Sequence, residues 1–122
     1  MSTRALIAVP KEDGIHYVYC HHDGYPSGLG AVLHDHYNSF EAACSILDLG
    51  NLSGLEATLE ASDFYHRDRE EPMEDNCSIV VADTDELFEV VRDYDAEYCY
   101  LWDAVNNRWI CRDTKTCIER SL

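Results

Sequence analysis

β-Branched and aromatic residues dominate the first part of the chain in two short runs. They occupy residues 3–9 and 15–22, and an Asp-Gly pair between the runs favours a tight turn. The pattern predicts a β-hairpin at the start of the chain. Because successive side chains of a strand point to opposite faces, Tyr19 and His21 should share one face of the second strand.

Helical spacing follows a Gly-rich turn at residues 23–30. Apolar positions recur at three and four residues in 29–36, and again in 40–47. Asn38 with Glu41 is a candidate capping pair for the second of these helices. A further helix is predicted from Asp83 or Thr84 to about Tyr94. Residues 51–60 are predicted to form a short helical turn with weaker periodicity.

The remaining segments complete the prediction of the fold. Residues 77–82 indicate a compact strand, and residues 96–113 a second hairpin that turns at two asparagines, with a short terminal strand after it. Residues 61–76 lack periodicity and are predicted to be an exposed loop. We therefore expect a single α+β domain over residues 1–122, with a mostly antiparallel sheet of about four or five strands and three or four helices mainly on one face.

Negative charge is the most unusual property of the composition. Twenty-four acidic and nine basic residues give the 122-residue chain a formal charge of −15. Residues 63–75 hold six acids and two bases, and residues 83–97 hold seven acids and one base. Such a surface repels nucleic acid, phosphate-rich ligands and anionic membranes, and it attracts basic protein surfaces.

One acidic stripe follows from helical spacing. Asp85, Glu89 and Asp93 are four residues apart, so a helix presents them on one side. In one interpretation they form a row of carboxylates that imitates the phosphates of a nucleic acid and binds a basic groove. In the other they belong to a solvated face, where the acids of the first helical turn interact favourably with the positive end of the helix dipole. The first interpretation predicts a partner-binding set that includes the acidic loop: Asp85, Glu86, Glu89, Asp93, Glu70, Glu71, Glu74 and Asp75.

Two histidine pairs and six cysteines give no metal or cofactor prediction. His21 and His22 point to opposite faces of a strand, and His34 and His36 do not face each other on a helix. The cysteines show no paired spacing and lie mostly in apolar runs, which indicates reduced core thiols. No run is long enough to span a membrane and no signal peptide is evident, so we expect a cytoplasmic protein without a metal or cofactor.

Several motifs together resemble a family of small uncharacterised bacteriophage and prophage proteins. The chain has an MSTR start, a CHHDGYP turn, a helix that ends in HY, a YHRDREE segment and a C-terminal aromatic hairpin. The resemblance covers nearly the whole chain. It implies a mobile-element accessory protein in a bacterial host, and it marks polar positions that match the motifs: Arg4, His21, Asp23, Tyr25, Arg67, Asp68 and Arg69.

Charge and resemblance together lead to one main functional hypothesis. It is a non-enzymatic protein that inhibits a host nucleic-acid-binding defence machine, such as a CRISPR effector, by binding the basic surface of that machine. Direct nucleic-acid and membrane binding are not expected. Two alternatives remain open. The first is a protein that binds a small ligand such as a nucleotide, or a small enzyme, with a pocket formed by the motif residues. The second is a virion or assembly protein.

Overall fold

Eight strands form one mixed sheet. The computed structural model describes residues 2–122, and its strand order is β4-β3-β2-β1-β6-β7-β8, with β5 also paired to β2. Met1 of the MSTR motif lies outside the described residues. The predicted number of about four or five strands is wrong, although the class is α+β and most strand pairings are antiparallel. The strands are β1 (Ala5–Lys11), β2 (Gly14–Cys20), β3 (Leu52–Gly54), β4 (Asp63–Phe64), β5 (Ile79–Val81), β6 (Tyr98–Asp103), β7 (Arg108–Asp113) and β8 (Glu119–Ser121).

A parallel pairing at the centre of the sheet joins the two predicted hairpins. β1 is antiparallel to β2 and parallel to β6, and Ala5 lies opposite Tyr98 in that parallel register. Turn signals in a sequence report which neighbouring strands pair, but they carry no information on which hairpins lie side by side. The hairpin signals therefore could not predict the parallel pairing of β1 with β6.

The shortest strands lie where helix or loop was predicted. β3 falls in residues 51–60, which were predicted to be helical. β4 and helix α3 (Tyr65–Arg69), followed by a 3₁₀ turn at Met73–Asp75, fall in residues 61–76, which were predicted to be a loop. Strands of two or three residues cannot display an alternating pattern, so only their pairing with neighbouring strands defines them.

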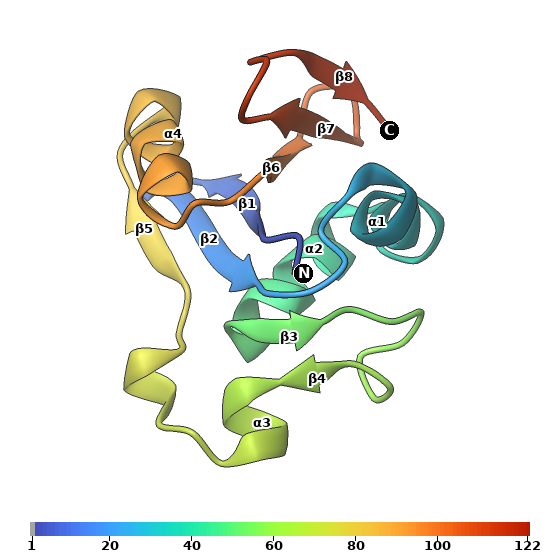
Figure 1. The fold of residues 1–122 in the computed structure, drawn as a ribbon, viewed down its shortest axis with the longest axis vertical. Coiled ribbons are helices and arrows are strands. Elements are labelled where there is room, and N and C mark those ends of the chain that lie inside the picture. Colours follow the sequence, from blue (N-terminus) through green and yellow to red (C-terminus); the bar gives the residue numbers. More distant parts are fainter. Residues whose placement is uncertain (1) are drawn as a thin grey trace.

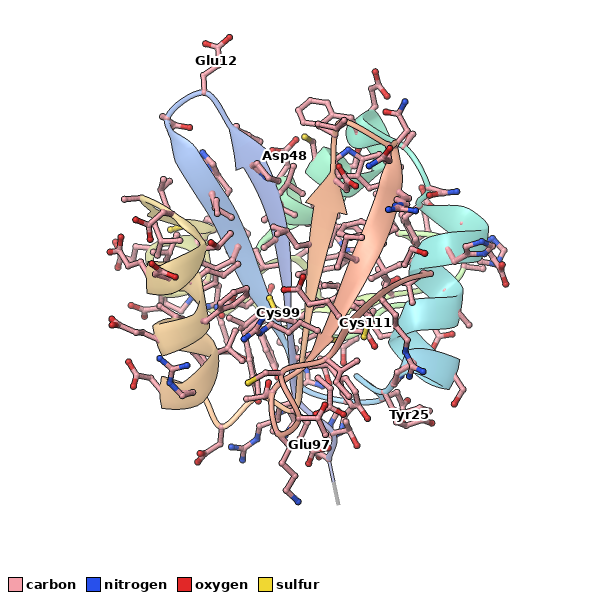
Figure 2. The ribbon with its side chains drawn as sticks, turned by 90° about the horizontal axis from the view of Figure 1, so that it is seen from above. Glu12, Tyr25, Asp48, Glu97, Cys99 and Cys111 are labelled. Atoms are coloured by element: carbon pink, nitrogen blue, oxygen red, sulfur yellow. The ribbon has the colours of Figure 1, made fainter. Side chains whose placement is uncertain are left out.

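Helices cover both faces of the sheet, whereas the sequence predicted them mainly on one. A π-helical turn (Pro26–Gly30), α1 (Ala31–His36) and α2 (Phe40–Leu49) pack on one face, and α4 (Thr84–Asp93) packs on the other. Figure 2 shows α4 and α1 on opposite sides of the long strands. The physical reason lies in β1, whose first five residues are fully buried and therefore need apolar cover on both faces.

The helix pattern is otherwise close to the prediction. Ser39, not Asn38, caps α2, and its hydroxyl accepts a hydrogen bond from the Ala42 amide at 3.1 Å. Phe40 was expected to face the core but is 41% exposed, while Ile46 takes a fully buried position. α4, the second hairpin and the terminal strand are confirmed, and Asp83 is the residue that caps α4.

Two short strands, β5 and β3, pair with different parts of the same edge of β2, and Asn51 bonds to β2 between them. β5 pairs with the first half of β2, and β3 pairs with its end at Cys20. Between these contacts the Tyr19 amide donates to the Asn51 side-chain oxygen at 2.9 Å. The Asn51 amide in turn donates to the Asn76 carbonyl at 2.7 Å, which ties the start of β3 to the segment before β5.

Candidate functional site

The eight acidic residues predicted to bind a partner are all exposed. They occupy the segment between α3 and β5 and the solvent side of α4, so they flank β5 on the left of the molecule in Figure 1. Within residues 2–122, none of the eight carboxylates forms an ion pair. In this part of the chain, no direct salt bridge therefore neutralises any of these eight carboxylates.

One of these acids also has a structural role at the start of α4. The Glu86 carboxylate accepts a hydrogen bond from the Ala82 amide at 2.9 Å, and the Asp83 carboxylate accepts one from the Glu86 amide at 2.9 Å. This reciprocal arrangement satisfies amides that the first helical turn leaves free. Asp85, Glu89 and Asp93 make no comparable contact, so their carboxylates are available to a partner.

Exposed apolar side chains lie between the two acidic segments. Ile79 and Val80 of β5 are 47% and 42% exposed. β5 pairs only with β2 in the described part of the chain, so its outer edge carries no strand partner. We define the acidic face as this strand together with Glu70, Glu71, Glu74, Asp75 and the acids of α4. It combines an apolar centre with a charged rim.

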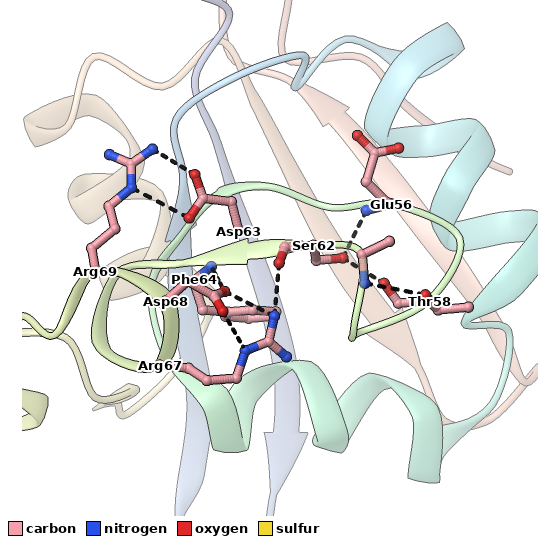
Figure 3. A network of polar contacts seen from close by, with 9 residues as sticks. Glu56, Thr58, Ser62, Asp63, Phe64, Arg67, Asp68 and Arg69 are labelled. Carbon is pink, nitrogen blue, oxygen red and sulfur yellow. Dashed lines mark hydrogen bonds and ion pairs between the residues drawn. The ribbon is translucent and has the colours of Figure 1, made fainter.

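The predicted ligand pocket does not form as one unit, because Arg67 and Asp68 are used within α3. Figure 3 shows the Arg67 guanidinium bound to the Ser62 carbonyl at 2.7 Å and to both oxygens of Asp68 at 2.8 and 2.9 Å. It also lies over the Phe64 ring at 5.1 Å. The Asp68 carboxylate accepts the Phe64 amide at 2.8 Å, and these bonds hold the pKa of Asp68 below its usual value.

Asp23 and Tyr25 lie in the turn that leads to α1. Asp23 has a φ of 57°, its carbonyl accepts the Leu29 amide at 2.8 Å, and its carboxylate receives a long 3.4 Å contact from the Tyr25 hydroxyl. The two side chains line a hollow of about 130 Å³ together with His22. No hydrogen bond or ion pair in residues 2–122 joins Asp23 to Arg4 or Arg67.

Arg4 and His21 lie next to the last paired residues of the first hairpin. The β1–β2 register ends with Ala5 opposite Cys20, and Arg4 and His21 are the adjoining residues of the two strands. The charge of Arg69, at the end of α3, contributes to lowering the pKa of His21 after desolvation and the charges of His22 and Arg4. Its guanidinium is held by Asp63 at 2.5 Å and lies over the Tyr65 ring at 5.1 Å.

Aromatic side chains fix the position of His21. The Tyr19 hydroxyl lies 2.6 Å from His21 Nδ1, and the Tyr94 ring from α4 stacks on Tyr19 with centroids 5.2 Å apart. The His22 ring meets His21 edge on at 4.5 Å, and its Nδ1 lies 3.0 Å from the Ser2 hydroxyl. We call Arg4, Tyr19, His21, Arg69 and Tyr94 the His21 cluster.

Burial and neighbouring positive charge favour the neutral form of His21. Desolvation lowers the pKa of His21, and the charges of His22, Arg4 and Arg69 lower this pKa further. Burial raises the pKa of Tyr19, so the phenol stays protonated. The Tyr19 hydroxyl and His21 Nδ1 therefore share one hydrogen bond, whose donor is set by the imidazole tautomer.

The charge of Arg4 should be measurable through His21. We expect the pKa of His21 to lie below 6.5, its ordinary value, in a ¹H–¹⁵N NMR titration of the imidazole. Arg4→Gln should raise this pKa, because it removes a neighbouring cation. Since the unfolded state binds a proton more readily, His21 stabilises the fold above about pH 6.5 and this contribution falls as the pH drops. An unchanged pKa in Arg4→Gln would contradict the assigned proximity.

The sequence predicted some residues of the acidic face and of the His21 cluster, but not all of them. The period-two pattern placed Tyr19 beside His21, and helical spacing found the acidic stripe. The last predicted helix extended to about Tyr94, and nothing in its local pattern indicated that the Tyr94 ring would stack on Tyr19. Ile79 and Val80 were read as part of a compact apolar strand, a pattern that does not show which strand edge remains open.

Comparison with known proteins adds no family. Searches against protein-family models, curated proteins and solved structures give no match for this chain. In residues 2–122, no helix is long and apolar enough to cross a membrane. The same residues contain no group of three or more His, Cys, Asp or Glu side chains placed to hold a metal ion, and their six cysteines are free.

Proposed function

We propose that the protein binds the basic, nucleic-acid-binding surface of another protein through its acidic face, and inhibits that protein by covering the surface. One observation carries the proposal: unpaired carboxylates surround an exposed apolar strand edge. A merely solvated acidic surface does not require an apolar centre. Protein interfaces commonly combine the two, with an apolar core inside a polar rim.

The arrangement of the carboxylates favours a basic partner. Asp85, Glu89 and Asp93 follow one side of α4 at intervals of about 6 Å, so they form a linear row of negative charge. Such a row attracts a cationic groove over distance and repels nucleic acid itself. Ile79 and Val80 would then supply apolar area that excludes water from part of the contact.

The proposed biological setting comes from the motifs that resemble phage proteins. A host defence complex that holds nucleic acid in a cationic channel has the surface chemistry that the acidic face requires. Occupation of that channel in the bacterial cytoplasm would prevent the complex from binding its nucleic-acid target. The proposal includes no catalytic step.

Charge reversal on the acidic face tests the proposal. We expect Glu74→Lys, Glu89→Lys and Asp93→Lys together to weaken binding at least tenfold, about 1.4 kcal/mol, because attraction becomes repulsion. The tagged protein would be used to capture partners from bacterial lysate at low and high salt. An identified partner would then be purified, and competition with its nucleic acid would be measured. High salt should weaken the contact through screening.

A matched variant separates the acidic face from overall charge. Asp48→Lys, Glu56→Lys and Glu60→Lys together change the net charge equally, and these exposed carboxylates lie on other segments and form no ion pair in residues 2–122. This variant should keep most of the affinity. Equal losses in both variants, or a partner whose nucleic-acid binding is unaffected, would refute the proposal.

A further inference from the structure

A cleft of about 630 Å³ opens at one end of the sheet. Two loops line it: residues 95–98, where α4 leads into β6, and residues 113–115, which follow β7. The Thr114 amide donates to the Glu97 carbonyl at 3.0 Å, so the two loops are joined beside the cleft. In Figure 2 the end of the sheet marked by Glu97 lies opposite the end marked by Glu12. A cleft of this volume has room for a small metabolite.

Charges of both signs line this cleft without pairing. Arg92 and Lys115 are its exposed cations, and Asp95 and Glu97 are exposed carboxylates. Within residues 2–122, none of these four side chains forms an ion pair. The cleft therefore offers unmatched groups of both signs, which suits a ligand that carries a cation and an anion of its own.

The hydroxyl of Thr114 is the group in the cleft that a solvated surface does not explain. Its oxygen is buried and has no hydrogen-bond partner among residues 2–122. A buried hydroxyl without a partner costs free energy of folding. The residue as a whole is half-buried and lines the cleft, so rotation about its Cα–Cβ bond can turn the hydroxyl towards a ligand. A ligand acceptor would then supply the missing partner.

Asp113 holds the second loop in place and is not itself free for a ligand. Its carboxylate accepts the Lys115 and Thr116 amides at 2.9 and 3.2 Å, and its carbonyl accepts the Cys117 amide at 2.8 Å. These bonds fix the backbone that carries Thr114 and Lys115, which lowers the entropy lost when a ligand binds. One of the three lining acids is thereby used, which leaves two carboxylates against two cations.

This balance of charge selects the class of ligand. The chain as a whole repels anions, because its net charge is −15. A simple cation would be attracted by the whole surface but would be repelled by Arg92 and Lys115. A zwitterion matches both pairs of charges. Ala96, which is 2% exposed, and the half-buried Tyr98 add apolar surface for the remainder of such a ligand.

We infer that this cleft binds a zwitterion of the amino-acid class, with its carboxylate at Arg92 and Lys115 and its ammonium at Asp95 and Glu97. The Thr114 hydroxyl donates a further hydrogen bond to the ligand carboxylate. A free amino acid and a short peptide can each supply the two charged groups. None of the eight acids predicted to bind a partner lines the cleft, so this site and the acidic face can be tested independently.

Ligands that lack one of the two charges test the site. Phenylalanine, glycyl-phenylalanine, phenethylamine and 3-phenylpropionate would be added separately to the isotope-labelled full chain in about 0.15 M salt, which screens general attraction of cations. NMR would follow the amide shifts of Thr114 and Lys115. We expect saturable shifts with the two zwitterions, and binding weaker by about tenfold or more with the other two compounds. Tighter binding of glycyl-phenylalanine than of phenylalanine would identify a peptide ligand, and the reverse order a free amino acid.

Substitution of the charged groups provides a second arm. Lys115→Gln and Glu97→Gln should each weaken phenylalanine binding by about tenfold or more, because each leaves one ligand charge unmatched. Lys11→Gln and Glu12→Gln make the same changes of charge near the opposite end of the sheet and should leave binding unchanged. None of these four residues is buried, so we expect every variant to fold, and a thermal melt would verify it.

Thr114→Val separates ligand binding from stability. The substitution removes a hydroxyl that has no partner in the described residues, so the midpoint of thermal unfolding should not fall. Phenylalanine binding should nevertheless weaken by about tenfold, because a hydrogen bond to a charged group is lost. The site is refuted if neither zwitterion gives saturable shifts, if phenethylamine or 3-phenylpropionate binds as tightly as phenylalanine, or if folded Lys115→Gln and Glu97→Gln keep full affinity.

Discussion

Gly50→Ala should lower the free energy of unfolding by at least about 3 kcal/mol, a large part of the stability of a small domain. Gly50 has φ 87° and ψ −158°, a conformation that is open almost only to glycine. An added Cβ would lie 2.2 Å from the Asn76 carbonyl oxygen. That oxygen cannot retreat freely, because it accepts the Asn51 amide at 2.7 Å. Urea denaturation followed by circular dichroism measures the loss.

Gly54→Ala is the matched control for this substitution. Gly54 is at the end of β3, a few residues away, and no atom lies within 4 Å of the Cβ it would gain. Its φ is not positive, so alanine fits the backbone. We expect a change within about 0.5 kcal/mol. Similar losses in the two variants would show that the junction between β3 and β5 is not the reason for the glycine at position 50.

Trp109→Ala should cost about 3–5 kcal/mol, because it empties a central volume of the core. Trp109 is 1% exposed and meets Trp102 edge on, with ring centroids 5.3 Å apart. Its indole N–H donates to the Tyr37 carbonyl at 3.0 Å, which attaches the end of α1 to β7. The substitution therefore removes packing and a buried hydrogen bond together. Urea denaturation followed by far-ultraviolet circular dichroism would measure the effect.

Phenylalanine variants separate the two contributions. Trp102 and Trp109 are equally buried, but the Trp102 indole N–H has no hydrogen-bond partner in the described residues. Both changes to phenylalanine remove similar volume, and only the one at position 109 removes a hydrogen bond. We expect Trp109→Phe to be less stable than Trp102→Phe by about 1 kcal/mol. Equal stability would mean that the bond to Tyr37 contributes little.

Local signals predicted the parts of the fold that local forces define. The first hairpin, the helix after Asp83 and the second hairpin are each specified by alternation, helical spacing or turn residues. The prediction failed at β3, where pairing with β2 and β4 overrides a weak helical pattern, and at β4, which is too short to show a pattern in a segment predicted to be a loop. The prediction also placed α4 on the wrong face of the sheet. The amphipathic pattern of this helix shows that one side is buried, but it does not show which face of the sheet that side covers.

The two candidate surfaces show the same division. The residues of the acidic stripe, and the shared face of Tyr19 and His21, follow from the periodicity of a helix and a strand. The predicted ligand set was drawn from motifs that lie far apart in the chain, at its start, at residues 20–26 and at residues 65–71. The structure does not join this set into one site, because Arg67 binds the Ser62 carbonyl and Asp68, while the Asp23 carboxylate contacts Tyr25 in its own turn.

By itself the sequence determined the charge of this protein, the helix that displays much of it and the two hairpins, because each depends on residues close together in the chain. Tertiary structure alone decided that β5 leaves an apolar edge between acidic segments, and that Tyr94 stacks on Tyr19, whose hydroxyl contacts His21. These arrangements depend on strand order and on the face that each helix covers. Both are set by burial of the whole core, which no local pattern records.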